Sequence, residues 1–360
     1  MKNVIANGIL AAGSTTSAAA LGAADSTAPV QLRSVKKIVD DGSWNGVPAL
    51  TQWRDEYWLA YRNATGHELR TGDIVISTSK DSDTWRERRR LNLLKDDRDP
   101  HFIATPDRLF LYTYNDDHGN HCRRLRCRTT SGIFVTYTDD GKTWSEPQSV
   151  YLSHFILWGR PLAHGDRFYA AAHRYVSIQN SRCHLITSSD GIHWEKVSTI
   201  RAGKAPGETA LHFAPDGRLT AFLRNNDRAR TLHGVILESL PPYTQWGDAD
   251  VEWKERDAGV HLAGQCAYTF NGVTYLTSRV RPNNDNKFAG AIVYTYEGGA
   301  LKPYCDLPAR GDCSYPVAVQ VDPDEMMVVY YSNDITAPAR SDDPVCHLYL
   351  ARVPLKSPSK

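Results

Sequence analysis

Five arginines recur along the chain and carry its clearest chemical signal. They lie on or beside short apolar and β-branched runs, and they are Arg62, Arg98, Arg160, Arg224 and Arg279. A guanidinium group holds a carboxylate through two parallel charge-assisted hydrogen bonds, so arginines gathered at one cavity would bind an acidic ligand. Asp99, next to Arg98, is a further candidate for ligand contact, although Asp99 and Glu208 can instead pair with the arginines. Such a site requires a fold that gathers distant segments.

Three repeated segments indicate what that fold is. They run from 78 to 85, 137 to 144 and 187 to 194, and each places an aspartate (Asp81, Asp140 or Asp190) four residues before a tryptophan. Their starts lie 59 and then 50 residues apart, which is the length of a supersecondary unit. The aspartate can accept backbone N–H groups in a tight turn, and the tryptophan is a large apolar anchor. The pattern predicts a repeat protein.

The runs between these turns favour strands, because alternating and β-branched residues are separated by turn residues. With 360 residues and a period near 50, we expect one all-β domain over 27–360, a six-bladed β-propeller. The blades are expected near 45–92, 98–144, 156–194, 209–238, 266–296 and 315–353. The segment 30–39 should pair with 346–353 and close the ring, which removes exposed sheet edges. A propeller directs its inner strands to one axis, where the arginines would meet.

The repeated turns resemble the Asp-box of the sialidase superfamily, which reads Ser-x-Asp-x-Gly-x-Thr-Trp. Here the aspartate stands one place later and the first copy lacks the glycine. The resemblance covers about residues 44–355 and implies the six-bladed propeller of that superfamily, within a divergent sialidase-like group. Asp-boxes lie at blade edges in the family, so they indicate architecture and leave the chemistry to other segments.

Two further segments resemble catalytic parts of sialidases. Residues 207–225 are similar to the segment in which a glutamate opens one strand and an arginine closes the next. This implies Glu208 as a buried carboxylate beside the nucleophile and Arg224 as a group that binds the substrate carboxylate. Residues 311–316 are similar to the segment with the nucleophilic tyrosine, which points to Tyr315. A phenol of pKa about 10 needs a base to attack, so a nearby glutamate is chemically sensible.

The start of the first blade departs from the family pattern. Sialidases have Arg-Ile-Pro-Ala-Leu there, whereas this chain has Gly46 in the place of the first arginine. The acid/base aspartate of the family also has no clear match. His67, Glu68 and Asp73 are nearby, and histidine is the side chain that ordinarily titrates near neutrality. The proton donor is therefore expected to be His67 or Asp73.

The composition excludes several classes of partner. A formal net charge of +1 gives no electrostatic reason to expect nucleic acid or an anionic membrane. No stretch approaches the roughly 20 apolar residues of a membrane span. Residues 1–26 loosely fit a signal peptide, with a disordered leader as the alternative, and predict a secreted or periplasmic protein.

The cysteines could form disulfide bonds, and one polar insertion contains residues that could bind a metal ion. Seven cysteines leave at least one free thiol, and Cys122 with Cys127, or Cys305 with Cys313, can form a disulfide. The insertion 115–131 contains His118, His121 and both cysteines of the first pair, but their spacing matches no familiar zinc pattern. We therefore expect a surface or lid loop, no metal and no cofactor.

The first hypothesis is an exo-acting glycoside hydrolase for an oligosaccharide or glycoconjugate that ends in an acidic sugar. Tyr315 and Glu208 would be nucleophile and base, His67 or Asp73 the acid, and the arginines the anion-binding groups. A polysaccharide lyase is an alternative, because proton abstraction from a uronate can use His and Tyr. Its candidate residues are His67, His173, His212 and Tyr175. A propeller that binds glycans without catalysis is the third hypothesis, since propellers host many activities.

Overall fold

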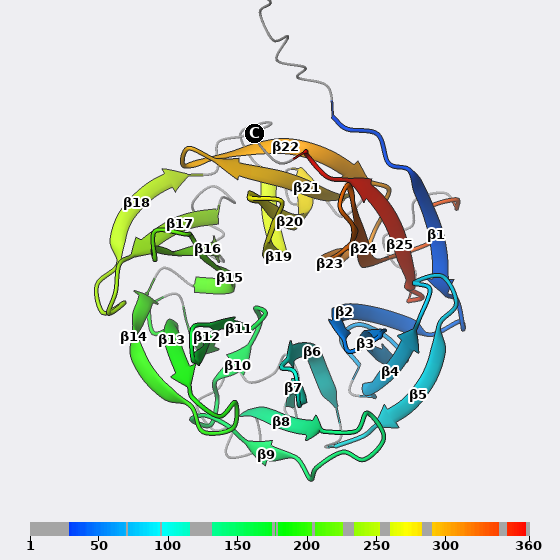
Figure 1. Ribbon diagram of the computed structural model, residues 1–360, viewed down its shortest axis with the longest axis horizontal. Coiled ribbons are helices and arrows are strands. Elements are labelled where there is room, and N and C mark those ends of the chain that lie inside the picture. The colour runs from blue at the N-terminus through cyan, green and yellow to red at the C-terminus, as the bar shows by residue number, and fades with distance from the viewer. Residues whose placement is uncertain are drawn as a thin grey trace, which may run out of the picture.

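The protein forms a ring of six antiparallel β-sheets around a central axis (Figure 1). The computed structural model describes residues 29–69, 71–93, 96–115, 132–174, 177, 179–203, 206–225, 234–252, 260–282, 290–337 and 344–357. Every regular element in these ranges is a strand. Accordingly, the described residues contain no helix with the length and apolar character needed to cross a membrane.

The strands follow one another blade by blade. Blade 1 holds β2 (Trp44–Trp53), β3 (Glu56–Ala64), β4 (Asp73–Ser79) and β5 (Arg86–Leu91). Blade 2 holds β6 (Asp97–Ala104), β7 (Leu109–Asn115), β8 (Gly132–Thr138) and β9 (Gln148–Ser149). Blade 3 holds β10 (Ile156–Leu157), β11 (Leu162–His164), β12 (Arg167–Arg174), β13 (Arg182–Ser188) and β14 (Glu195–Ala202).

The second half of the ring repeats this order. Blade 4 holds β15 (Pro206–Phe213), β16 (Leu219–Asn225), β17 (Gly234–Ser239) and β18 (Gly247–Glu252). Blade 5 holds β19 (Val260–Phe270), β20 (Val273–Pro282), β21 (Gly290–Glu297) and β22 (Ala300–Leu307). Blade 6 holds β23 (Ser314–Asp322), β24 (Glu325–Ser332), β25 (His347–Pro354) and β1 (Ser34–Val39). The predicted six-bladed propeller is confirmed.

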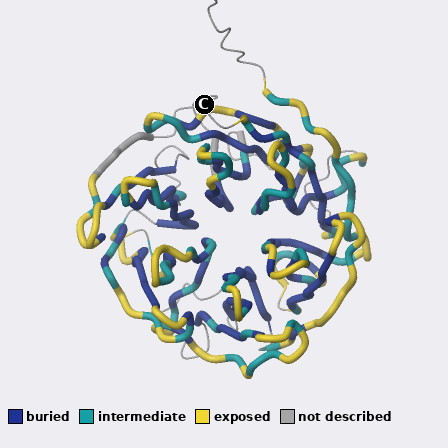
Figure 2. The backbone as a smooth tube through the Cα atoms, viewed as in Figure 1, coloured by how far each residue is buried: buried dark blue, intermediate teal, exposed yellow. Residues whose placement is uncertain are grey.

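Each blade starts near the axis and ends at the rim, and burial follows this order (Figure 2). In blade 2 every residue of β7 is buried, whereas five of the six residues of β5 at the rim of blade 1 are exposed. The inner strands are covered on both faces by neighbouring blades, so they lack the polar alternation of a half-exposed strand. Side chains on inner strands such as β7 are therefore closely packed.

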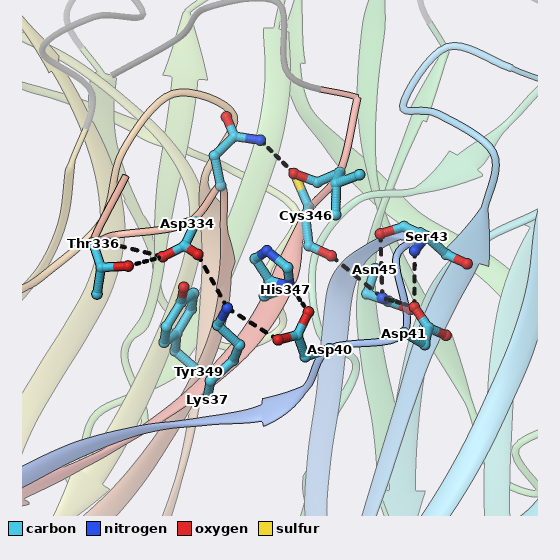
Figure 3. A network of polar contacts seen from close by, with 12 residues as sticks. Lys37, Asp40, Asp41, Ser43, Asn45, Asp334, Thr336, Cys346, His347 and Tyr349 are labelled. Atoms are coloured by element: carbon cyan, nitrogen blue, oxygen red, sulfur yellow. Dashed lines mark hydrogen bonds and ion pairs between the residues drawn. The ribbon is translucent and has the colours of Figure 1, made fainter. Parts of the chain in front are cut away.

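The ring closes between the two ends of the described chain. β1 pairs antiparallel with β25, with Val35 opposite Ala351, as predicted from the sequence. Figure 3 shows the polar contacts at this seam, where the Lys37 Nζ lies 3.2 Å from carboxylate oxygens of both Asp40 and Asp334. The His347 Nδ1 lies 3.0 Å from Asp40 Oδ1. Closure gives β25 a partner on both sides and removes a bare sheet edge.

The repeated turns have the expected hydrogen bonds. Asp140 Oδ1 accepts the backbone N–H groups of Lys142 and Thr143, each at 2.7 Å. These bonds stabilise the charged form and lower the pKa of Asp140 to about 2. The corresponding aspartates of the other two copies bind their own turns in the same way. All three turns join the third and fourth strands of a blade, so they stabilise the rim.

A disulfide between Cys305 and Cys313, which the sequence left open, does not form, because both residues are free buried thiols. Cys305 lies on the outermost strand of blade 5, whereas Cys313 precedes the innermost strand of blade 6. Burial raises the pKa of the Cys305 thiol to about 12, which keeps it unreactive. The alternative pair Cys122 and Cys127 lies outside the described residues, as do the leader 1–26 and the rest of the insertion from 116 to 131.

Closure makes blade 6 part of the largest apolar core, which predicts a strong effect of truncating a closing strand. Leu350 on β25 is 1% exposed within that core. Leu350→Ala should lower the free energy of unfolding by about 2–5 kcal/mol, because it loses burial and leaves a cavity. Thermal and denaturant unfolding measure this, with Leu152→Ala, at a side chain that is 59% exposed, as the control. Equal melting temperatures for the two variants would contradict the packing described.

Candidate active site

Five blades carry the same irregularity near the start of their first strand. In each, two residues of the first strand face one residue of the second, which is the arrangement of a β-bulge. Bulges turn side chains out of the normal alternation, so they can aim them at the axis. The five bulged pairs are Val47–Pro48, Asp99–Pro100, Gly207–Glu208, Gly264–Gln265 and Tyr315–Pro316.

Tyr315 and Glu208 meet across the axis from blades 6 and 4. The Tyr315 Oη donates a hydrogen bond to Glu208 Oε1 at 3.0 Å, and Arg224 Nη1 donates to the same oxygen. Glu208 is 5% exposed. Burial acts to raise the pKa of Glu208, but the charges of Arg224 and Arg279 together with hydrogen bonds from the backbone and Tyr315 outweigh it, and the pKa is lowered. Burial, with the negative charges of Glu208 and Asp99, raises the pKa of Tyr315 well above its ordinary value. The resting pair is a neutral phenol that donates to a carboxylate.

Arg279 lies beside this pair. The side chain is buried, and it interacts electrostatically with Glu208 and Tyr315. Its Nε has no hydrogen-bond partner among the described residues. A buried cation without partners is costly unless an anion compensates it. Arg279 and Arg224, whose side chain is 21% exposed, therefore form an arginine pair suited to a carboxylate.

Arg62 has a different role from the one predicted. It is 1% exposed, and its guanidinium donates to the backbone carbonyls of Gly66, His67 and Leu69 at 3.4, 3.3 and 2.5 Å. These bonds fix the loop 65–72 between β3 and β4. Arg62 is a positioning residue for that loop, and its donors are occupied by protein acceptors.

Asp96 completes this support and was missed by sequence reasoning. It is fully buried and accepts from Arg62 Nη2 at 2.8 Å, from Arg98 Nε at 2.6 Å and from the Gly72 N–H at 3.0 Å. A side chain at Gly72 would come within 2.3 Å of Arg62 Nε. Arg98, predicted to bind ligand, is thus also committed to the protein. The aspartates at positions 96, 97 and 99, at the start of β6, were the available signal.

The fixed loop presents His67. Its Nδ1 lies 2.6 Å from Asp312 Oδ2, and its side chain is 42% exposed. Trp44 Nε1 donates to the same oxygen at 2.8 Å, and Tyr331 Oη donates to Asp312 Oδ1 at 3.2 Å. Burial would raise the pKa of Asp312, but the His67 charge and these hydrogen bonds lower it to about 2. Asp312 orients the imidazole and leaves Nε2 without a partner among the described residues, as in other carboxylate-supported histidines.

The absent first arginine has a structural explanation. A Cβ at Gly46 would lie 2.3 Å from the Trp44 indole, so no side chain fits there. The indole packs against the His67 ring, with centroids 4.8 Å apart, and lies under the Arg62 guanidinium at 5.1 Å. Trp44 and His67 together occupy the corner of the site where the family pattern has its first arginine.

Asp99 lies in the bulge of blade 2 with a positive φ of 46° and is 7% exposed. Burial raises its pKa to about 7, against the nearby positive charges of Arg98, Arg62 and His67, and Glu208 adds to the rise. The structure therefore brings a readily protonated carboxyl group to the Tyr315–Glu208 pair.

Two predicted residues lie away from this pair. Asp73 accepts from Asn92 Nδ2 at 2.6 Å and lies 3.8 Å from Arg90, both on the rim side of blade 1. Arg160 donates to the Ala267 carbonyl at 2.9 Å and stacks on Tyr268, further along β19 than the bulge. Neither has a hydrogen bond or ion pair with Tyr315, Glu208 or the arginine pair.

Two of the three histidines that were candidates for a lyase, His173 and His212, are committed to packing. His173 is fully buried, its Nε2 lies 3.0 Å from Thr209 Oγ1, and burial lowers its pKa to about 4. His212 Nε2 lies 2.9 Å from Thr269 Oγ1. Tyr175 lies outside the described residues. Within the described ranges, no three His, Cys, Asp or Glu side chains lie close enough together to hold a metal ion.

Comparison with solved structures identifies the architecture. Trypanosoma rangeli sialidase in complex with sialic acid matches with a TM-score of 0.67 over 89% of this chain, at 12% sequence identity. The chain has the propeller fold of the sialidases. A Hadza microbial sialidase matches with a TM-score of 0.65 over 87% of the chain, at 15% identity. The chain covers 57% and 66% of those two sialidase chains.

A protein of unknown function from Dyadobacter fermentans has the same sialidase-like fold. It matches with a TM-score of 0.72 and 17% identity, over 91% of this chain and 99% of that one. No protein-family model and no curated protein matches the sequence. At these identities the likeness concerns the sialidase-like fold, and the function has to be argued from the site.

The raised pKa of Asp99 predicts a stability that depends on pH. A carboxyl group whose pKa is raised on folding stabilises the folded protein fully at pH values below its unfolded pKa, which is near 4. This stabilisation is lost as the pH rises through the folded pKa of about 7. Asp99→Asn should therefore melt at the same temperature as the wild type near pH 4 and at a higher temperature above pH 7. Thermal unfolding across this range tests it, with the exposed Asp107→Asn as control. A constant difference at all pH values would contradict the assignment.

Proposed function

We propose that the protein is an exo-acting glycoside hydrolase that removes a terminal sugar bearing a carboxylate. The observation that carries the proposal is the buried hydrogen bond from Tyr315 to Glu208 beside Arg224 and Arg279. The pair supplies a nucleophile with its base, and the arginines supply an anion site at the same place. The trypanosomal sialidase of like fold was solved with sialic acid, a carboxylated sugar, which supports this substrate class.

The first half of the reaction forms a covalent intermediate. As Tyr315 Oη attacks the anomeric carbon, its proton passes to Glu208, whose lowered pKa keeps it ionised and able to accept. The bond from that carbon to the leaving oxygen breaks, and His67 Nε2 protonates this oxygen. Arg224 and Arg279 hold the sugar carboxylate in place throughout.

The second half consumes one water molecule. His67 takes a proton from the water as it attacks the anomeric carbon, and Tyr315 leaves and recovers its proton from Glu208. Two displacements at one carbon give net retention of configuration. The products are the free sugar acid and the alcohol of the leaving group, and the enzyme returns to its starting protonation.

His67 is preferred to Asp73 as the proton donor. The arginine-held loop fixes its backbone, and Asp312 fixes its ring, so Nε2, which has no partner among the described residues, is held in one orientation. The carboxylate of Asp73 is occupied by Asn92. Asp99, placed next to these groups, is suited to bind a sugar hydroxyl.

The test of this function is mass spectrometry of the purified protein incubated with a panel of sialylated and uronate-containing oligosaccharides. Ultraviolet absorbance is followed in parallel. Products that carry the elements of water support the hydrolase and identify the sugar. An absorbing unsaturated product would instead mean a lyase, and saturable binding without any product would mean a glycan-binding propeller.

Removal of the nucleophile should abolish turnover without loss of structure. Tyr315→Phe deletes only the hydroxyl, so we expect the rate to fall about 10³-fold or more while the ligand still binds the arginine pair. Steady-state kinetics and calorimetric titration with the free sugar acid measure the two effects. Full activity of Tyr315→Phe would refute its role as nucleophile.

The acid role of His67 predicts a dependence on the leaving group. His67→Gln should slow hydrolysis of a natural glycoside by about 10²–10⁴-fold, because an alkoxide leaves poorly without protonation. A 4-nitrophenyl glycoside should be affected far less, since its phenolate leaves unaided. Asp73→Asn is the matched control and should leave both rates unchanged. Equal losses on both substrates in His67→Gln would exclude proton donation by this residue.

A further inference from the structure

Tyr315 and Glu208 belong to blades 6 and 4, which are not neighbours. Blade 5 lies between them in the ring (Figure 1). The 3.0 Å contact between Tyr315 and Glu208 therefore depends on how blade 5 holds the bulges on either side of it.

Gln265 connects blade 5 to the bulge of blade 4. This residue is 1% exposed and lies in the bulge of β19. Its Nε2 donates to the Glu208 carbonyl at 2.8 Å and to the Phe222 carbonyl at 2.9 Å. The first bond binds the backbone of the base itself, and the second binds the neighbouring strand β16, so one amide fixes the bulge that aims Glu208.

On the blade 6 side, the contact is made by Thr277 on β20. Its side chain is fully buried, and its hydroxyl donates to the carbonyl of Pro316, the residue that follows Tyr315 in the bulge of β23. A bulge has carbonyls that the strand ladder leaves unpaired, so a side-chain donor from the next blade is a direct means of fixing it.

Gly264 lets the two bulges approach. Its φ is +62°, and a Cβ there would lie 2.3 Å from Ser314 Oγ and 3.0 Å from the Tyr315 ring. Any larger residue would push the phenol away from β19. The ring of Tyr315 thus lies directly against β19, the strand whose Gln265 also binds the backbone of Glu208.

We propose that Gln265 and Thr277 are positioning residues that set the distance between nucleophile and base. Blade 5 acts as a spacer with one hydrogen bond to each catalytic bulge. The proposal rests on the hydrolase function given above, and neither residue needs to touch substrate. Because a displacement of about 1 Å in a catalytic group can cost about 10²-fold in rate, loss of either bond should act on catalysis.

The kinetic test uses Gln265→Leu and Thr277→Val, which keep the volume and remove the donor. Each should lower kcat by about 10–100-fold with KM changed by less than about threefold, since the arginine pair is retained. Thr277→Ser keeps the hydroxyl and should recover most of the rate. Thr220→Val, at an equally buried threonine near the far end of blade 4, is the control and should have no effect. Equal losses in Thr220→Val and Thr277→Val, or no rescue by Thr277→Ser, would overturn the proposal.

A second test separates this inference from the hydrolase function. Crystal structures of Gln265→Leu and Thr277→Val should show the Tyr315 Oη to Glu208 Oε1 distance opened beyond hydrogen-bonding range, whether or not the wild type turns over any substrate. An unchanged distance in both variants would refute the spacer role even in an active enzyme. In an active enzyme, Gln265→Leu should also add little to the loss caused by Glu208→Gln, because both act through one carboxylate.

Discussion

Closure of the ring is the constraint on which the other features depend. The pairing of β1 with β25 gives blade 6 its fourth strand and leaves no end blade free to turn away from the axis. Only in a closed ring do Tyr315 and Glu208, 107 residues apart, stay within one hydrogen bond. The polar contacts at the seam, around Lys37 and Asp40, lie at the surface, while the apolar core of blade 6 lies beneath them. Hydrophobic burial therefore contributes most of the free energy that closes the ring, and the surface ion pairs contribute less.

The bulges convert this regular ring into a site. A regular strand alternates its side chains between two faces that pack against neighbouring blades, so it offers few groups to the axis. The two-residue bulges near the strand starts break that alternation at one level of five blades. Glu208 and Arg224 then sit opposite each other across one bulge, and the ion pair keeps a buried carboxylate charged. The bulge places the Glu208 carboxylate, and the ion pair with Arg224 keeps it charged.

The corner around Trp44 distinguishes this site from the sialidase pattern, which has an arginine where this chain has Gly46. Trp44 occupies the space of a side chain at position 46, and its N–H helps Asp312 to hold His67. The indole ring of Trp44 and the oriented imidazole of His67 therefore stand in the place of that arginine. Of the predicted arginines, Arg224 and Arg279 adjoin the Tyr315–Glu208 pair, while Arg62 and Arg98 serve the loop that carries His67. Residues of one type thus divide between the surroundings of that pair and the support of a loop.

The sequence by itself determined the repeat, the strand pattern, the six blades and the closing strand. These follow from local periodicity, from turn chemistry and from recurring motifs, which a linear string retains. The segments around Glu208 and Tyr315 were singled out by their resemblance to sialidases. It did not reveal Asp96, Asp312 or Gln265, and it grouped Asp73 with the site and Cys305 with Cys313. Those assignments depend on which side chains meet across blades and on how far each lies from the axis. Only the tertiary structure decides such contacts, because Asp96 lies 34 residues from Arg62 and Asp312 lies 268 residues from Trp44.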